Sequence, residues 1–496
     1  MSKILKNLLG LSLAALMVAT VTFTSCKKDD APVKAPEVKT LDTSKFVVVF
    51  GDTLKILKGE IKGTLTLSAD TNYLLVGFVY VVNGAKIVIP AGTIIKGDKA
   101  SEGTLIIEPG GMIDAQGTKE KPIVFTSAQA VGARTYSDWG GIVLCGNAPV
   151  NTISGTTKPQ IEGGPRTTYG GDKADDNSGI LKYVRIEFAG YPFQPDKEIN
   201  GLTFGGVGSA TIIDYIQVSY SGDDSYEWFG GTVNAKHIIA FRGQDDEFDT
   251  DNGWLGKVQF ALGIRDYRKA DISGSNGFES DNDAAGTSNK AITNGIFCNV
   301  SCFGPYDSIT KANVDANFKR GMHIRRNSAL NVYNSVFAGW PVGLLLDEDK
   351  TYANATGTGD ANMVIKNTAL INCVTTFAAA SAKKTFADTT VRDWFLKTMT
   401  GNKVYKPAAK NLEYSNANPN KMLGIFGAYA KNDEKTAPVV VPQGNSELLT
   451  MASFGDAAIK DAFFDQTVTF IGAVGTDDWT AGWAEWAPKY KDYNKK

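Results

Sequence analysis

The chain has 496 residues, of which 43% are hydrophobic, 21% are charged and 52 are glycine. The 51 Lys and Arg residues almost balance the 53 Asp and Glu residues, which argues against a nucleic-acid-binding surface. Only two histidines, His237 and His323, are present. This count argues against a metal site with several histidine ligands and against a Ser-His-Asp hydrolase.

The N-terminus has the pattern of a secretory signal. Lys3 and Lys6 precede an apolar run over residues 8–23, and Thr24-Ser25-Cys26 follows. This run is too short and wrongly flanked for a membrane-spanning helix. A cysteine at the cleavage point resembles a bacterial lipoprotein signal. We therefore predict a signal peptide over residues 1–25 and lipidation of Cys26, which would anchor the protein to the outer membrane.

Residues 26–45 are predicted to be a disordered tether, because KKDD and the following Pro, Lys and Val mixture cannot bury a core. A flexible chain of roughly 18 residues spans about 20 to 25 Å. The KKDD run resembles the surface-export signal of Bacteroidota lipoproteins and implies exposure at the cell surface. The alternative is an ordinary solvated charge run, with the domain facing the periplasm.

Short β-rich runs begin at Phe46, including FVVVF, GTLTL, YLLVGFVYVV and GTLIIE, and turn residues separate them. The first of these strands are expected to cover the open end of the coil. Later runs such as 181–190 and 213–222 alternate apolar and polar residues and end in Gly. Their period of two places one set inside, namely Val184, Ile186, Phe188, Ile216, Val218 and Tyr220.

One acidic motif is repeated. DDSYE (223–227) matches DDEFD (245–249) after 22 residues, and GFESDND (277–283) matches again after a step of 30. The phase continues at Gly321-Met322-His323 and Gly343-Leu344-Leu345. A period of this length indicates a repeat architecture, and β-rich segments favour a β-solenoid over helical repeats. We predict an all-β fold, a right-handed parallel β-helix, over residues 46–380.

Equivalent carboxylates on adjacent coils would lie about 4.8 Å apart and repel one another. Relief requires splayed side chains, a raised pKa, a basic partner such as Arg242, Arg265 or Arg325, or a bound hard cation. We predict Ca²⁺ as the cofactor. Its candidate ligands are Glu227, Asp249, Asp251, Glu279 and Asp281. The alternative is that these Asp and Asn residues are ordinary turn formers.

The same stretch suggests a ligand-binding surface. Gly222-Asp223-Asp224 and Gln244-Asp245-Asp246 resemble the paired-aspartate motif of β-helix polygalacturonases, but that family's Gly-His-Gly and basic motifs are absent. Aromatic residues among the acids suit sugar binding, although they are also typical core residues. The candidate ligand-binding residues are Asp223, Asp224, Tyr226, Trp228, Asp245, Asp246 and Trp254.

The period fades beyond Phe377, and residues 381–496 are predicted to be a C-terminal cap or appendage. Apolar residues over 385–399 have helical spacing, and a second short helix is expected around 456–464. Trp479, Trp483 and Trp486 are expected in its core or on a docking face. Four further cysteines are interpreted mainly as buried thiols rather than disulfides, namely Cys145, Cys298, Cys302 and Cys373.

Four motifs in order, SDWGGIVLCGNAPVN (137–151), IEGGP (161–165), GGDKADDNSGILKYVRIEFAG (170–190) and GAVGTDDWTAGWAEW (472–486), resemble a family of secreted β-helix lipoproteins in Bacteroidota. The resemblance implies a right-handed parallel β-helix at the outer membrane, beside a TonB-dependent receptor, and implies no reaction. We expect a surface lipoprotein that binds a glycan or peptide as an accessory subunit. The alternatives are a polysaccharide-degrading enzyme and a structural or adhesive surface protein.

Overall fold

The computed structural model of the chain describes residues 45–194, 197–406 and 418–494. The predicted signal peptide, Cys26 and the predicted tether up to residue 44 lie outside the described residues. Among the residues described, no helix combines the length and apolar character needed to cross a membrane.

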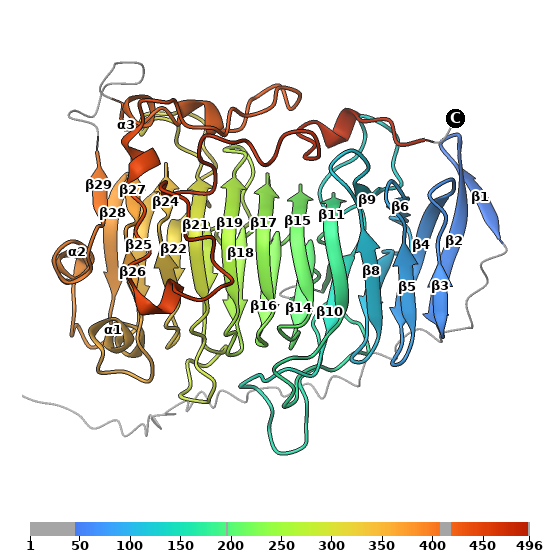
Figure 1. The fold of residues 1–496 in the computed structure, drawn as a ribbon, viewed down its shortest axis with the longest axis horizontal. Helices are drawn as coiled ribbons and strands as arrows, with labels where there is room; N and C mark the ends of the chain where they lie inside the picture. Colours follow the sequence, from blue (N-terminus) through green and yellow to red (C-terminus); the bar gives the residue numbers. More distant parts are fainter. Residues whose placement is uncertain (1–44, 195–196, 407–417, 495–496) are drawn as a thin grey trace, which may run out of the picture. The chain divides into compact units, whose positions relative to one another are not determined.

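The described chain winds into a parallel β-helix, in which each coil stacks its strands on those of the coil before (Figure 1). The stacking follows the predicted period, because Tyr226 pairs with Phe248 across a step of 22 and Phe248 pairs with Phe278 across a step of 30. The longer step is absorbed by a loop between strands. The prediction of a parallel β-helix is therefore confirmed.

Three parallel ladders of strands, called sheets 1, 2 and 3, form the walls. Long strands bend from one sheet into the next, so that 27 strands are hydrogen-bonded together. Sheet 1 contains β2 (Asp52–Ile61), β4 (Asn72–Val81), β6 (Ile94–Gly97), β9 (Ile123–Ser127), β11 (Gly179–Glu187), β15 (Ile212–Ser219), β17 (Asn234–Phe241), β19 (Lys257–Ile264), β21 (Ile296–Phe303), β24 (Val336–Ala338), β27 (Ala369–Ile371) and β29 (Lys403–Tyr405).

The other two walls share some of these strands. Sheet 2 adds β3 (Thr64–Thr66), β5 (Lys86–Ile89), β8 (Met112–Gln116), β23 (Asn331–Tyr333) and β26 (Ile365–Lys366) to the first halves of β11, β15, β17, β19 and β21. Sheet 3 contains the second halves of β2 and β4 with β7 (Thr104–Ile107), β10 (Gly141–Cys145), β14 (Leu202–Gly205), β16 (Tyr226–Phe229), β18 (Phe248–Asp251), β20 (Phe278–Ser280), β22 (Arg320–Ile324), β25 (Val342–Asp347) and β28 (Thr375–Ala380). A separate hairpin joins β12 (Pro192–Gln194) and β13 (Lys197–Glu198).

Apolar side chains fill the inside of the coils, as the period-two pattern predicts. Val184 and Ile186 of β11 belong to this core and are fully buried. Phe188 and Tyr220 do not, although the same alternation placed them inside. Both have positive φ values, 65° and 56°, at a corner of the coil. The left-handed backbone there breaks the alternation and turns both rings outward.

Each end of the β-helix carries an additional element. At the first coil, β1 (Phe46–Val49) folds back antiparallel onto β2, as expected for the first strands. At the last coil, α2 (Asp388–Asp393) and a π-helical turn (Trp394–Thr398) place Val391, Trp394 and Phe395 in the central core. This confirms the helix predicted over 385–399. A further helix, α1 (Asp349–Thr356), follows β25.

The C-terminal segment differs from the expected appendage. The β-helix continues to β29 at Tyr405, beyond the predicted boundary at 380. Residues 418–494, called here the C-terminal strap, then run back along sheet 1 to the first coils (Figure 1). The strap contains α3 (Pro419–Met422) and 3₁₀ turns at Phe426–Ala428, Glu447–Thr450, Ala457–Ile459 and Pro488–Tyr490. The expected short helix around 456–464 is the third of these turns.

The strap is held by a second apolar core and by buried polar contacts. Trp483 is fully buried and packs edge-on against Tyr183 and Tyr215, whose rings stack with centroids 4.3 Å apart. At its far end the Tyr493 hydroxyl donates to Glu187 Oε1 at 2.7 Å. The Trp cluster is therefore mainly a core element, because it covers the outer face of sheet 1.

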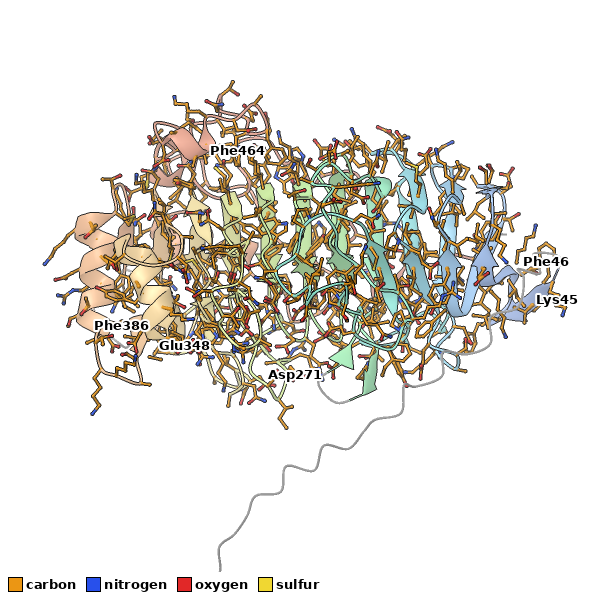
Figure 2. The ribbon with its side chains drawn as sticks, turned by 90° about the horizontal axis from the view of Figure 1, so that it is seen from below. Lys45, Phe46, Asp271, Glu348, Phe386 and Phe464 are labelled. Carbon is orange, nitrogen blue, oxygen red and sulfur yellow. The ribbon has the colours of Figure 1, made fainter. Side chains whose placement is uncertain are left out.

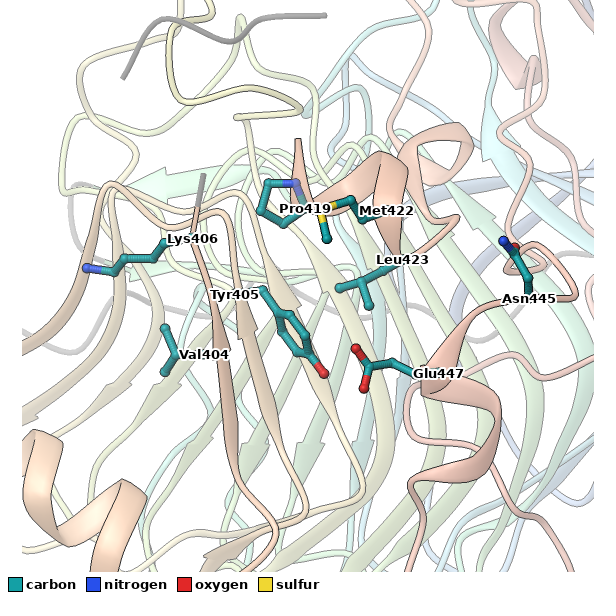
Figure 3. Close-up of a pocket in the computed structure, with 8 residues that line it drawn as sticks. All are labelled: Val404, Tyr405, Lys406, Pro419, Met422, Leu423, Asn445 and Glu447. Carbon is teal, nitrogen blue, oxygen red and sulfur yellow. The ribbon is translucent and has the colours of Figure 1, made fainter. Parts of the chain in front are cut away.

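A hollow of about 290 Å³ lies between β29 and the strap, lined by Tyr405, Leu423 and Glu447 among others (Figure 3). It holds none of the predicted site residues.

Cys145, Cys298, Cys302 and Cys373 are free and buried, as the interpretation as core thiols requires.

Candidate functional site

The predicted site residues lie on the outer face of sheet 3, where one outward position of each strand forms a row across the coils. In β14, β16, β18, β20 and β22 this position holds, in turn, Thr203, Glu227, Asp249, Glu279 and His323. Adjacent strands lie about 4.8 Å apart. The predicted stacking of the three acids, called here the acidic row, is confirmed.

The aromatic candidates face the opposite way. Tyr226 and Trp228 flank Glu227 in β16, and alternation points both rings into the coil, where they are fully buried. The Tyr226 hydroxyl donates to the carbonyls of Ile216 and Ile239 on sheet 1. Trp254 is also fully buried in this core. The prediction that these three residues bind a ligand is wrong, because their rings are closed off from solvent.

Two of the aspartates before the strands hold the coils in register. The backbone N–H of Asp246 donates to Asp224 Oδ1 at 2.8 Å, and the backbone N–H of Asn276 donates to Asp246 Oδ1. Asp245 accepts a hydrogen bond from the Ser273 hydroxyl at 2.8 Å on one oxygen, and its other oxygen is buried without a partner among the described residues. In each Asp-Asp pair, the second aspartate (Asp224 or Asp246) thus accepts a backbone hydrogen bond from the next coil.

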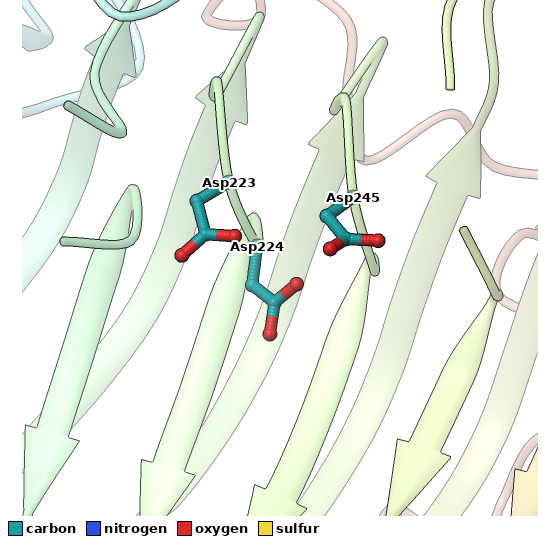
Figure 4. A group of neighbouring side chains, drawn as sticks. All are labelled: Asp223, Asp224 and Asp245. Carbon is teal, nitrogen blue, oxygen red and sulfur yellow. The ribbon is translucent and has the colours of Figure 1, made fainter. Parts of the chain in front are cut away.

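Carboxylates from neighbouring coils converge in two groups. Asp223, Asp224 and Asp245 bring one oxygen each to within 4.8 Å of one another (Figure 4), and Asp224, Glu227 and Asp249 do the same. Asp224 is shared by both groups. The structure therefore joins two predicted metal ligands, Glu227 and Asp249, with residues predicted to bind a ligand.

The other predicted metal ligands have protein partners. Arg325 Nε lies 2.7 Å from Asp281 Oδ1, and the same guanidinium pairs with Glu279. Arg326 also pairs with Asp281, at 2.7 Å, and His323 Nδ1 lies 3.2 Å from Glu279 Oε2. These bases already pair with both carboxylates, and neither Glu279 nor Asp281 belongs to the two carboxylate groups, so their role as metal ligands stays a prediction.

This half of the row is electrostatically compensated. Burial alone would raise the pKa of Glu279, but the hydrogen bond from His323 and the charge of Arg325 outweigh burial and hold this pKa below its ordinary value. The other ring nitrogen of His323 lies 3.1 Å from Asp347 Oδ2. Asp251 belongs to neither carboxylate group, and its Oδ1 accepts the backbone N–H of Asn252 at 2.6 Å.

The first half of the row is not compensated. Among the described residues, no ion pair with Lys, Arg or His forms at Asp224, Glu227 or Asp249. Burial raises the pKa of all three carboxyls well above their ordinary range, and neighbouring carboxylates raise it further. One Asp249 oxygen is buried without a hydrogen-bond partner. These three carboxyls therefore lie close together in a buried setting without a basic partner among the described residues.

Two further residues complete the site and were missed by sequence reasoning. The amide nitrogen of Asn200 donates to Glu227 and also to Glu162 Oε1, at 3.3 Å. Asn200 is fully buried, and its Oδ1 has no partner among the described residues. Burial raises the pKa of Glu162 to about 7. The IEGGP motif contains Glu162, but no period connects this loop residue to the acidic row.

Comparisons with known proteins agree with the architecture. A family model described as a pectate-lyase-like β-helix domain matches residues 59–411. No curated protein matches the chain. A crystal structure of pectate lyase Pel9A is similar over 80% of this chain and 89% of its own, with 12% identity and a TM-score of 0.26, too low to carry an argument. On the family match, which covers more than half of its length, the chain belongs to the pectate-lyase-like β-helix domain family.

Proposed function

We propose that the group of Asp224, Glu227 and Asp249 binds a divalent cation, Ca²⁺ by the chemistry of its donors, and through it an anionic polysaccharide. The observation that carries this proposal is the convergence of Asp224, Glu227 and Asp249 within 4.8 Å without a basic partner among the described residues. Carboxylate and amide oxygens are the ligands that Ca²⁺ prefers.

The donor set fits such an ion. Two charges 4.8 Å apart repel by about 3 kcal/mol at the effective dielectric of a protein surface, and a cation removes this cost for several carboxylates at once. The spare acceptors are already directed to this part of the molecule: one Asp249 oxygen and the Oδ1 of the adjacent Asn200 lack hydrogen-bond partners. Arginines compensate the charges of Glu279 and Asp281, whereas these oxygens have no such partner among the described residues and are available to a cation.

A polysaccharide is the proposed ligand because the family takes its name from enzymes that act on pectate. An anionic polymer suits the site better than a neutral one. A cation held by the row would attract a sugar carboxylate, and Arg325 and Arg326 lie on the same face. Contacts with Tyr226, Trp228 and Trp254 play no part, since these rings are buried.

The cellular setting is likewise proposed from the sequence. Lipidation of Cys26 would hold the protein on the outer membrane, and the KKDD run supports exposure at the cell surface. In this setting the protein acts as a binding or accessory subunit that delivers the polymer to a neighbouring TonB-dependent transporter. Protection from protease on intact cells would contradict surface exposure. Retained fatty-acid labelling in Cys26→Ala would contradict the anchor.

Polysaccharide cleavage is the second candidate function. It is favoured by one geometric feature, that the Asn200 amide nitrogen bonds carboxyl oxygens of both Glu162 and Glu227. Two carboxyls brought together in this way differ in proton affinity, because like charges at short distance do not ionise together. Such a pair can hold and release one proton at neutral pH, as acid–base chemistry on a glycosidic bond requires.

Titration calorimetry with Ca²⁺, followed by polygalacturonate in the presence and absence of Ca²⁺, tests both functions. We expect cation binding that is lost in Asp249→Asn and retained in Asp393→Asn, a half-buried acid of α2 that pairs with Arg392 and Lys397. Polymer binding without shortened products supports the binding function. Products that disappear in Glu162→Gln support cleavage. Absence of cation binding by the wild-type protein would contradict the proposal.

A further inference from the structure

The first hairpin of the β-helix carries an apolar face that the rest of the described chain leaves uncovered. Phe46, Val48 and Phe50 are 58%, 68% and 62% exposed. Among the described residues, Phe46 and Phe50 are the phenylalanines with high exposure, although the chain contains 25. Three large exposed apolar side chains within five residues of the chain are a local concentration rather than scattered single residues.

The strand register explains why Phe46 and Val48 project outward, and Phe50 lies in the turn that follows β1. In the antiparallel pair of β1 and β2, Phe46 lies opposite Lys55 and Val48 lies opposite Thr53, and directly opposed residues share one face. The alternate residues, Val47 and Val49, are partly buried against Leu54 and its neighbours. We call Phe46, Val48, Phe50, Thr53 and Lys55 the hairpin face. Figure 2 shows Phe46 and Lys45 at the end of the coils opposite Phe386.

The composition of the hairpin face is that of a membrane-interface anchor. Aromatic rings prefer the headgroup level of a bilayer, and a lysine beside them extends its ammonium towards the headgroups. β1 pairs only with β2 among the described residues, so its other edge is open as well. An open, apolar edge strand attracts another chain unless something covers it.

The chain that precedes the hairpin indicates what covers it. Phe46 follows the predicted lipidated cysteine by 20 residues. The predicted tether would span about 25 Å, so the proposed anchor would keep the hairpin close to the lipid surface. The other exposed large apolar residues of the described chain, such as Ile272 and Val439, are each separated in sequence from the next.

We propose that the hairpin face inserts into the headgroup region of the membrane and orients the β-helix on it. This inference rests on the proposed lipid anchor for proximity. The interaction itself requires only the hairpin face and a lipid surface.

Site-directed spin labelling tests the contact in the full-length lipidated protein. The four cysteines of the β-helix are buried and the predicted thiol of Cys26 is consumed by lipidation, so Val48→Cys provides a single reactive thiol. In vesicles of phosphatidylethanolamine and phosphatidylglycerol, we expect the label at position 48 to gain accessibility to oxygen and lose it to a polar relaxant. The matched label in Ile272→Cys, 90% exposed, should stay aqueous. Aqueous behaviour at both positions in vesicle-bound protein would overturn the inference.

Vesicle sedimentation of a chain that begins at residue 27, without the predicted signal peptide and Cys26, separates this inference from the anchor. Replacing Phe46, Val48 and Phe50 together by serine should lower the partition coefficient about tenfold or more, and Phe46→Trp should preserve it. That dependence would support the hairpin face even if Cys26 proves not to be lipidated. Equal partitioning of the serine variant would refute it. A concentration-dependent dimer seen by light scattering without lipid, and abolished by the serines, would instead assign the face to a second copy of this chain.

Discussion

Neutralising Asp249 should affect stability in opposite directions with and without a cation. Asp249 shares a group with Asp224 and Glu227, and all three oxygens lie within 4.8 Å. In chelator, Asp249→Asn removes like-charge repulsion and should stabilise the fold. In Ca²⁺ it should remove the stabilisation that binding provides.

The two effects have similar magnitudes. Repulsion at 4.8 Å amounts to about 3 kcal/mol for each pair at an effective dielectric of about 20, and partial protonation of these carboxyls reduces the gain to roughly 1 to 3 kcal/mol. A cation at a hundred times its dissociation constant stabilises the native state by about 2.7 kcal/mol. The wild-type protein should therefore respond to chelator far more than the variant does.

Thermal and denaturant unfolding of both proteins, with EDTA and with millimolar Ca²⁺, measures these differences. Asp393→Asn, on α2 and paired with Arg392 and Lys397, controls for loss of one negative charge outside the carboxylate groups. If Asp249→Asn lowers the melting temperature in EDTA, Asp249 is a required hydrogen-bond acceptor and the repulsion argument fails. If Ca²⁺ stabilises wild type and variant equally, the cation binds elsewhere.

Three further outcomes are expected. Ile186→Ala should cost about 2 to 5 kcal/mol of unfolding free energy, because it empties space in the central core, whereas Lys182→Ala on the same strand should cost little in denaturant titrations. Arg325→Gln should destabilise the protein and make its stability more dependent on Ca²⁺ in the same unfolding assay, because Glu279 and Asp281 lose a shared basic partner and keep only His323 and Arg326. Stability in EDTA should rise as pH falls from about 7 to about 4. Burial, with smaller contributions from nearby acids, raises the pKa values of Asp251 and Glu162 to about 7, and the native state then binds more protons than the unfolded chain. A melting temperature that falls steadily over this range would contradict the last expectation.

Local periodicity was sufficient to predict the fold and the stacking of the acids. A repeat of 22 residues with period-two strands is typical of a β-solenoid, in which equivalent residues of successive coils stack at the strand spacing. The register of Glu227, Asp249 and Glu279 follows directly from it. The same alternation also implies that Tyr226 and Trp228 lie on the opposite face from Glu227, so their assignment to the ligand surface could have been avoided.

Only the tertiary structure decided which carboxylates are compensated. Arg325 and Arg326 follow β22 and reach back to the turn after β20, and no repeat predicts their pairing. Glu162 and Asn200 enter the site from loops that lie outside the period. Likewise, Phe188 and Tyr220 point outward from sheet 1, where the C-terminal strap covers them. They therefore belong to a second core rather than to the expected central one. Stacking is a local property repeated along the chain, whereas charge compensation and burial depend on segments that are distant in sequence and meet only after folding.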